Sequence, residues 1–409
     1  MKISSAPEEI LQEINAVFGA LRAEYLHAEI FDLFTKPTYF SELLTTRPCL
    51  LVGGRGTGKT TVLRGMSYQG QARLNPGQYD DWEFVGTYWR FDTSVVRSFK
   101  GAGLDEEWWT KVFEHYANLV LCSLVLDFAE WFRDKHGRGL AFDERRLRQA
   151  GKQLGVEGGD SLEALSEGVT DALIVLESYV NNAAGAEAPK LSMLGRPVSK
   201  LVDALRVPEG LAERPIYFLL DEFENLMDYQ QRVLNTLIKH SDARISYKVG
   251  MKDTGHRERT TLNPDEQLID PADYALVDIA KRLAKRSDFG DFASEVCSGR
   301  LARIAGCLPR IDELLPGMTE DEEAESLGAK PLIDRIRRKV VSAGATPSEL
   351  KCFEEMDTLS ALLVGFWADG HRDETELSVL REAVRDPGLW EDRVNNYGHS
   401  ALFTIRPPV

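Results

Sequence analysis

The sequence is short of the features that mark secreted, zinc-binding and membrane-spanning proteins. Its five cysteines lie far apart and include no C-x-x-C pair, so we expect free thiols in a reducing compartment and no zinc site. The seven histidines form no pair at metal-ligand spacing. The first residues lack the apolar core of a signal peptide, and acidic residues interrupt the most apolar stretch, 117–132. We therefore expect a cytoplasmic protein that does not enter the membrane, with residues 117–132 in a buried helix.

Basic residues are fewer than acidic ones. The chain has 49 Lys and Arg against 65 Asp and Glu, a formal net charge of −16 over 409 residues. Because neutralisation of phosphates dominates the affinity for nucleic acids, this balance argues against a protein that coats DNA or RNA with its whole surface. The short basic runs at 281–286 and 335–339 have helical spacing and are interpreted as solvated faces. Nucleic-acid binding through a local face stays possible, but the charge does not support it.

The most informative pattern present is G-x-x-x-x-G-K-T at residues 53–60. An apolar run, 49–52, precedes it and a helical pattern follows, which is the order strand, loop, helix. Glycines let the backbone turn tightly and direct N–H groups inward, and the start of a helix favours anions, so a polyphosphate fits there. In this pattern Lys59 reaches the outer phosphates and the Thr60 hydroxyl binds Mg²⁺. The predicted nucleotide-binding residues are Gly53, Gly54, Arg55, Gly56, Thr57, Gly58, Lys59, Thr60 and Thr61.

A second apolar strand, predicted at 215–220, ends in Asp221 and Glu222. An unpaired buried carboxylate is costly, whereas beside a phosphate-binding loop Mg²⁺ and its waters offset that cost. In nucleoside triphosphatases with such a loop a strand-end Asp holds Mg²⁺, which is the role expected for Asp221 together with Thr60. Glu222 is the expected catalytic residue, with Lys59, because it can orient and deprotonate the attacking water. Glu224 is expected to cap a helix or to face solvent.

Strand-like and helix-like patterns alternate along the chain. Further strands are predicted at 84–92 and 245–249, and a helix at 229–240. Helices are expected before residue 36, across 106–135 and 142–180, and through most of the chain from 279 onward, with a loop at 181–189. This alternation predicts an α/β fold in which helices cover both faces of a parallel sheet. The predicted domains are N-terminal helices at 1–36, a nucleotide-binding core at 37–278 with a helical insertion at about 100–200, and a helical region at 279–409.

The hydrophobic-Asp-Glu ending resembles the AAA+ branch of P-loop ATPases. Residues 221–226, Asp-Glu-Phe-Glu-Asn-Leu, followed by Gln230-Gln231, are similar to the origin-recognition-complex-like ATPases, which grade into the STAND signalling ATPases. Residues 55–61 and 90–93 suit the bacterial members, some of which act in anti-phage defence beside an effector. The resemblance covers about residues 30–280 and implies a three-layer P-loop fold, ATP and Mg²⁺ as cofactors, and self-association or an effector protein as partner.

Several features depart from that family pattern or leave alternatives open. Lys59 and Asp221 stand far apart in sequence, so the helical block between them is interpreted as an insertion. Lys252, Asp253 or Thr254 could supply the polar sensor that AAA+ proteins carry after the next strand, and Arg310 could be a second sensor. Arg257 and Arg259 are either fingers for a neighbouring subunit's nucleotide or part of a surface loop.

Three functions fit the sequence. The favoured one is an ATP-dependent switch that hydrolyses ATP slowly and controls a partner protein. The second is an initiator-like or loader-like ATPase that nucleic acid stimulates. The third is a structural subunit with a permanently bound nucleotide.

Overall fold

The computed structural model describes residues 15, 18, 29–32, 34–302 without 76, 78, 158, 284 and 285, then 322, 324, 325 and 327–394 without 372. Internal contacts divide the chain into two compact units, Lys2–Leu308 and a smaller one built from Pro309–Val409. Most of the predicted N-terminal helices lie outside the described residues. The domain boundaries predicted from sequence stay a prediction.

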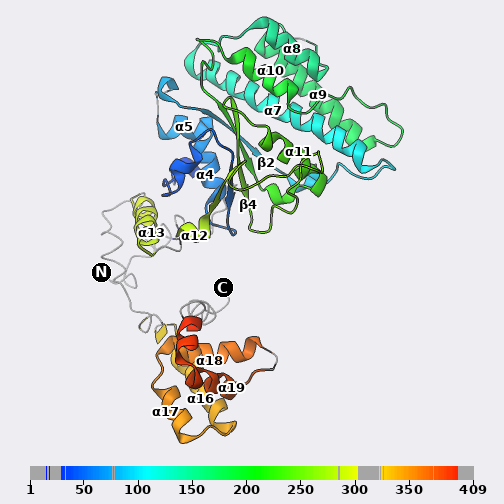
Figure 1. Cartoon of the computed structure of the whole chain (residues 1–409). Coiled ribbons are helices and arrows are strands. Elements are labelled where there is room, and N and C mark those ends of the chain that lie inside the picture. Colours follow the sequence, from blue (N-terminus) through cyan, green and yellow to red (C-terminus); the bar gives the residue numbers. More distant parts are fainter. Residues whose placement is uncertain are drawn as a thin grey trace. The chain divides into compact units, whose positions relative to one another are not determined.

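The larger unit alternates strands and helices (Figure 1). Its elements in chain order are α2 (Glu29–Asp32), α3 (Phe40–Leu43), β1 (Cys49–Val52), α4 (Lys59–Met66), α5 (Tyr68–Leu74), a 3₁₀ turn (Tyr79–Asp81), β2 (Val85–Arg90), α6 (Thr93–Val96), α7 (Glu106–His136), α8 (Glu144–Leu154), α9 (Leu162–Asn182), α10 (Arg196–Leu205), β3 (Ile216–Asp221), a second 3₁₀ turn (Phe223–Asn225), α11 (Asp228–Lys239), β4 (Ile245–Met251), β5 (Ala275–Asp278), α12 (Ile279–Leu283) and α13 (Arg286–Leu301).

The five strands form one sheet in the order β2-β3-β4-β1-β5, and every pair is parallel. Helices α4 and α5 cover one face, while α7 and α11 cover the other (Figure 1). All six residues of β3 and all seven of β4 are buried, as expected for strands covered on both faces. Because the strands are parallel, the residues that follow β1, β3 and β4 meet at one edge. The predicted three-layer α/β fold is therefore confirmed.

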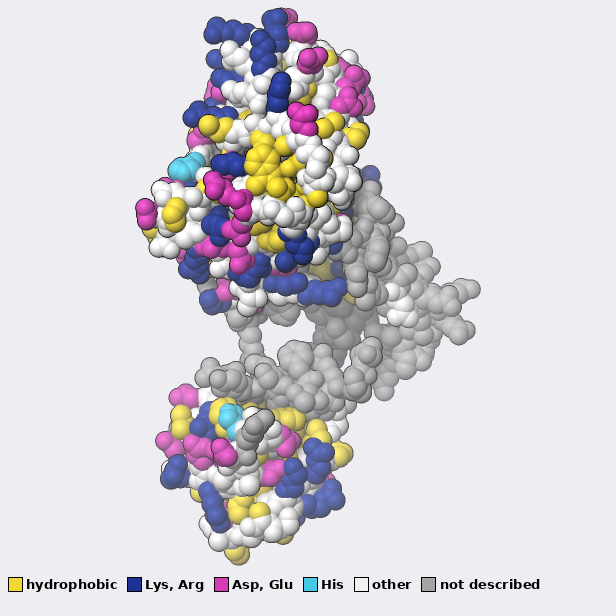
Figure 2. Space-filling model, turned by 90° about the vertical axis from the view of Figure 1, so that its right-hand side faces the viewer, with side chains coloured by type: hydrophobic (Ala, Val, Ile, Leu, Met, Phe, Trp, Pro, Cys, Tyr) yellow, Lys and Arg dark blue, Asp and Glu magenta, His cyan; other side chains and the backbone are white. Residues whose placement is uncertain are grey.

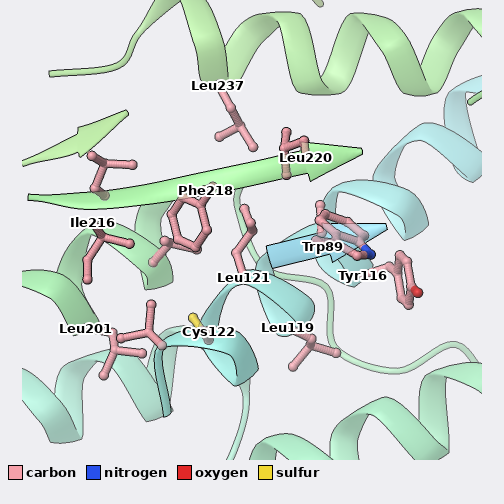
Figure 3. Packing of buried hydrophobic residues seen from close by; sticks show 14 of the residues in the cluster. Trp89, Tyr116, Leu119, Leu121, Cys122, Leu201, Ile216, Phe218, Leu220 and Leu237 are labelled. Atoms are coloured by element: carbon pink, nitrogen blue, oxygen red, sulfur yellow. The ribbon is translucent and has the colours of Figure 1, made fainter. Parts of the chain in front are cut away.

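The predicted helical insertion lies between β2 and β3 and is built from α6 to α10. Its longest helix, α7, has the length and apolar composition of a membrane span, alone among the helices of the described part. However, 78% of its most apolar window is buried inside the protein. Figure 3 shows the reason: Leu121 and Cys122 of α7 pack between Phe218 of β3 and Leu201 of α10. Helix α7 is thus the core helix of this unit, as predicted for 117–132.

Two elements differ from the pattern expected along the chain. The helical stretch expected at 142–180 is two helices, because Gly155 ends α8 in a left-handed conformation (φ 75°) and Ser161 caps α9 by accepting a hydrogen bond from the backbone N–H of Ala164. Strand β5 was not predicted. It has only four residues and lies at the edge of the sheet, where Leu276 is 43% exposed.

The smaller unit is helical in its described part, as predicted. Its helices are α16 (Ala329–Ser342), α17 (Pro347–Glu354), α18 (Thr358–Gly370) and α19 (Glu376–Arg385). Leu363 and Val364 of α18 pack with Val340 of α16 and Leu380 of α19 in a core of its own. Threonines open two of these helices through side-chain caps, Thr346 before α17 and Thr375 before α19.

Candidate nucleotide-binding site

The loop at residues 53–58 joins β1 to α4 at the edge where the strands end. Gly56 and Gly58 have φ values of +82° and +87°, which an L-residue rarely adopts, so the glycines of the motif are needed for this bend. The backbone N–H of Gly53 donates to the carbonyl of Met251 at 3.2 Å and fixes the loop to the end of β4. Helix α4 begins at Lys59, so its first N–H groups and its dipole face the loop.

Lys59 is half-buried and points back into the loop. Its ammonium donates to the carbonyls of Gly53 and Gly54, both at 2.7 Å. Burial lowers the pKa of Lys59, and the nearby carboxylates of Glu224 and Asp221 partly offset that shift. The side chain therefore places a cation inside the loop.

Asp221 closes the site from the end of β3, and its side chain is 1% exposed. Its Oδ2 accepts hydrogen bonds from the Thr60 hydroxyl at 2.7 Å and from the Tyr88 hydroxyl at 2.8 Å, and its Oδ1 accepts from the backbone N–H of Glu222 at 2.9 Å. Burial raises the pKa of Asp221, whereas these three bonds act to lower it. Residues 60 and 221, which the sequence analysis paired, are thus in direct contact.

A glycine that the sequence analysis did not single out makes this contact possible. A Cβ atom at Gly250, in the neighbouring strand β4, would lie 3.0 Å from Asp221 Oδ1 and 2.8 Å from Leu63 Cδ1 of α4. A side chain at this position would push α4 and the carboxylate apart. Gly250 therefore keeps the helix that carries Thr60 close to the strand that carries Asp221.

The two oxygen donors fit the predicted magnesium site. Thr60 Oγ1 and Asp221 Oδ2 lie 2.7 Å apart, and hydroxyl and carboxylate oxygens are the donors that Mg²⁺ accepts. Mg²⁺ usually takes only one or two such protein ligands and completes its shell with phosphate oxygens and water. Thr60 and Asp221 would therefore hold Mg²⁺ beside the phosphates at the start of α4.

Glu222 has a strained backbone and a held carboxylate. Its φ and ψ are +59° and +42°, a left-handed conformation that costs a non-glycine residue about 1–2 kcal/mol. Arg90 donates to Oε1 at 3.0 Å, and Asn225 Nδ2 donates to Oε2 at 2.9 Å. Asn225 is itself fixed through a 2.8 Å bond to the carbonyl of Phe91. The residue predicted to activate water is therefore held on both carboxylate oxygens.

The predicted sensor residues follow β4 directly. Lys252, Asp253 and Thr254 are all exposed, and the Lys252 ammonium lies 3.3 Å from Glu224 Oε1. Glu224 thus pairs with a predicted sensor, a contact that the sequence analysis did not foresee. Asp253 also contributes to the electrostatic surroundings of Lys59. Arg310 lies outside the described residues.

The two arginines considered as fingers differ. Arg257 Nε donates to Asp228 at 3.0 Å, and its other nitrogens donate to the carbonyls of Glu224 and Leu226. This side chain therefore stabilises the turn that follows Glu222. Arg259 is exposed.

Tyr88, Arg90 and Asn225 were not assigned roles from sequence. Tyr88 and Arg90 stand on β2, which pairs in register with β3 so that Arg90 lies opposite Asp221. One feature of the sequence points to them: Tyr88 and Arg90 lie at the end of a strand that is rich in aromatic residues. Without knowledge of which strands are neighbours, nothing connects that strand with Asp221 and Glu222.

Comparison with known proteins agrees with this geometry. A family model described as ORC-CDC6-like matches residues 16–407, which is most of the chain. Searches of curated proteins and of solved structures each find no significant match. The chain therefore belongs to the ORC-CDC6-like family, and the predicted resemblance to AAA+ ATPases of the origin-recognition type is confirmed.

Proposed function

We propose that this chain binds ATP with Mg²⁺ at the loop 53–61, hydrolyses it slowly, and uses the two nucleotide states to control a partner protein. Membership of an AAA+ family supports ATP binding and ATPase activity in general. The observation that carries the proposal is the single edge of the sheet at which Lys59, Thr60, Asp221 and Glu222 meet.

Each residue has a chemical task in this proposal. The N–H groups of the loop and of the first turn of α4 would bind the phosphate oxygens, with the Lys59 ammonium on the outer phosphates. The bound Mg²⁺ would neutralise charge that builds up on the phosphates. Glu222 would orient the attacking water and accept its proton.

Two observations support slow turnover by the chain alone: the contacts of Glu222, and the engagement of Arg257 within its own chain. Arg90 and Asn225 each take one acceptor position on the Glu222 carboxylate, which leaves fewer positions for the attacking water. Arg257, one of the two arginines considered as a finger, is engaged within its own chain. An arginine finger supplied by a neighbour raises such rates about a thousandfold or more. We therefore propose that a second copy or an effector protein completes the site, with Arg259 as the free candidate for the second copy.

The switch is favoured over a DNA-stimulated initiator or loader because the net charge of −16 opposes phosphate binding across the surface. The finer parts of the proposal, a cytoplasmic location and a setting in bacterial anti-phage defence, rest on composition and on the resemblance to STAND ATPases. A several-fold rise in ATP turnover on adding duplex DNA, with a steep salt dependence, would favour the initiator instead.

Two variants test the proposal. Lys59→Ala should abolish ATP binding in calorimetry, because it removes the cation inside the loop. Glu222→Gln should keep ATP binding and lower turnover by about 100-fold or more, the usual contribution of a general base. Equal turnover by Glu222→Gln and the parent chain would refute the role of Glu222.

A further inference from the structure

Helix α9 turns an unusual face toward solvent. Its residues Ile174 and Val175 are 59% and 56% exposed, and Met193, in the segment between α9 and α10, is 70% exposed. These are the three most exposed large hydrophobic side chains in the described part of the larger unit. Figure 2 shows that hydrophobic side chains gather on one face of this unit. The opposite side of α9 is an ordinary core face, where Leu176, Tyr179 and Val180 are buried.

The charge on α9 has one sign. The helix contains four acidic residues, Glu163, Glu167, Asp171 and Glu177, and no Lys, Arg or His. Glu167, Asp171 and Ile174 follow one another at spacings of four and three residues, so they form one stripe along the helix. Arg133 of α7 pairs with Glu163 at 2.6 Å, whereas within the described residues no cation forms an ion pair with Glu167 or Asp171. The exposed apolar residues and these two unpaired carboxylates thus lie next to each other along the helix.

A cavity adjoins the same stripe. It lies between α7 and α9, has a volume of about 470 Å³, and has Leu126 and Leu162 in its apolar lining. Its charged lining is mostly acidic, since Glu130, Glu163, Glu167 and Asp171 stand beside one cation, Arg133, which already pairs with Glu130 and Glu163. An apolar side chain could enter this cavity while a basic side chain beside it pairs with a carboxylate at the rim.

We propose that the outward face of α9 and this cavity form a docking surface for a segment of a partner protein with apolar and basic side chains on one face, as in a basic amphipathic helix. The inference rests on the proposed function, since it names the surface and the chemistry of the partner that the ATPase controls. Charge complementarity selects this occupant: an acidic partner segment would be repelled by Glu167 and Asp171, and a purely apolar one would leave them unpaired.

The position of α9 gives such a partner a route to the nucleotide site. Helix α9 packs along α7, for example through the 2.8 Å bond from Trp108 Nε1 to the Tyr179 hydroxyl. Helix α7 in turn packs on β2, where Tyr116 meets the ring of Trp89 at 6.1 Å. Trp89 lies between Tyr88, which holds Asp221, and Arg90, which holds Glu222.

The test uses the full chain and a fluorescent 18-residue helical peptide with one leucine face and one lysine face. A peptide of the same composition in scrambled order has the same charge but no apolar face. By fluorescence anisotropy, the amphipathic peptide should bind at least tenfold more tightly than the scrambled one. Ile174→Ser/Val175→Ser and Glu167→Lys/Asp171→Lys should each weaken its binding at least tenfold.

Matched controls come from the loop at 265–270, where Ile269 is also 50% exposed. Ile269→Ser makes one apolar-to-serine change away from α9, and Asp265→Lys/Asp270→Lys makes the same change in charge there; each should change affinity less than twofold. Equal affinity for the parent and both α9 variants would overturn the inference. So would a parent chain that sediments as a dimer which Ile174→Ser/Val175→Ser dissolves, because the face would then bind a second copy.

ATP binding and turnover are measured on the same samples. The α9 variants should keep the parent's ATP affinity, which shows that they are folded. A chain that turns over ATP through Glu222 but has no α9-dependent peptide binding refutes only the docking surface. A chain that binds the peptide through α9 and no ATP refutes the proposed function, and with it the regulatory role of the surface.

Discussion

Arg90 Nη2 donates to Glu222 Oε1 at 3.0 Å and joins the end of β2 to the residue that follows β3. The contact depends on the parallel pairing that places Arg90 opposite Asp221. Both side chains are partly exposed, so the pair is too weak to explain the stability of the fold. Its importance lies in the carboxylate oxygen that it occupies.

Arg90→Ala should raise the basal ATPase rate. The substitution gives Glu222 Oε1 one more free acceptor position for the attacking water, so we expect kcat to rise about three- to tenfold with little change in KM, equivalent to about 1 kcal/mol. Steady-state phosphate release measures both constants. Arg97→Ala, which removes an exposed arginine of the same segment, is the control and should leave kcat unchanged. A fall in kcat for Arg90→Ala would show that the arginine positions Glu222 instead of restraining it.

Tyr88→Phe should weaken the magnesium dependence of the ATPase. Loss of the 2.8 Å bond to Asp221 Oδ2 removes one of the contacts that lower the pKa of this buried carboxyl, so its charged form becomes less favourable. We expect the Mg²⁺ concentration at half-maximal rate to rise about three- to tenfold, and more at pH 6 than at pH 8.

The control for Tyr88→Phe is Tyr217→Phe. Tyr217 donates a 2.7 Å bond to the carbonyl of Leu44 before β1, at the other edge of the sheet. This variant loses a bond of the same kind and should keep the parent's Mg²⁺ dependence. If both variants shift it equally, the effect comes from general loosening of the sheet and Asp221 is not specifically tuned by Tyr88.

The sequence was sufficient where the chemistry is local. The glycines, Lys59 and Thr60 lie within eight positions, and Asp221 and Glu222 are adjacent, so the pattern carries the information that the fold then brings together. Tyr88, Arg90 and Gly250 act through strands that are neighbours only in space. Their roles follow from the order β2-β3-β4-β1-β5, which no local pattern encodes.

The sequence also does not identify which residue after β4 is the sensor. Three polar residues in a row follow β4, and all three are exposed, so neither hydropathy nor spacing distinguishes among them. The structure adds one discriminating contact, the pair between Lys252 and Glu224. After burial, Glu224 has the largest effect on the pKa of Lys59, which it raises, and this links Lys252 to the loop.

Lys252→Ala should therefore lower kcat by about tenfold, with a smaller effect on the affinity for ATP. Loss of the cation leaves Glu224 to interact more strongly with Lys59 and removes a positive charge from the edge where phosphate charge develops, worth about 1–2 kcal/mol. Thr254→Ala, two positions on, is the internal comparison and should be near neutral. The reverse ranking in single-turnover assays would assign the sensor role to Thr254.

A lysine in the middle of the sheet gives a prediction about stability. Lys248 of β4 is fully buried, with its ammonium donating to the carbonyls of Thr45 and Arg47 and lying 4.6 Å from the ring centre of Tyr217. Burial lowers the pKa of Lys248 to about 8, and the neighbouring Cys49 thiol opposes that shift slightly. No carboxylate contributes to the shift, so the charged form carries most of its burial cost.

Between pH 8 and the unfolded value of 10.5, the unfolded chain holds the Lys248 proton while the folded chain has released it, so this group makes stability rise with pH. In urea unfolding, the free energy of unfolding of the parent should rise by about 2 kcal/mol more than that of Lys248→Met between pH 7 and pH 9.5. Lys281→Met removes a lysine that is 82% exposed and should show no such gain. If the free energy of unfolding changes with pH in Lys248→Met as it does in the parent, the lysine keeps its proton in the folded chain. Its two hydrogen bonds to carbonyls, together with its contact with the Tyr217 ring, must then offset the cost of burying the charge.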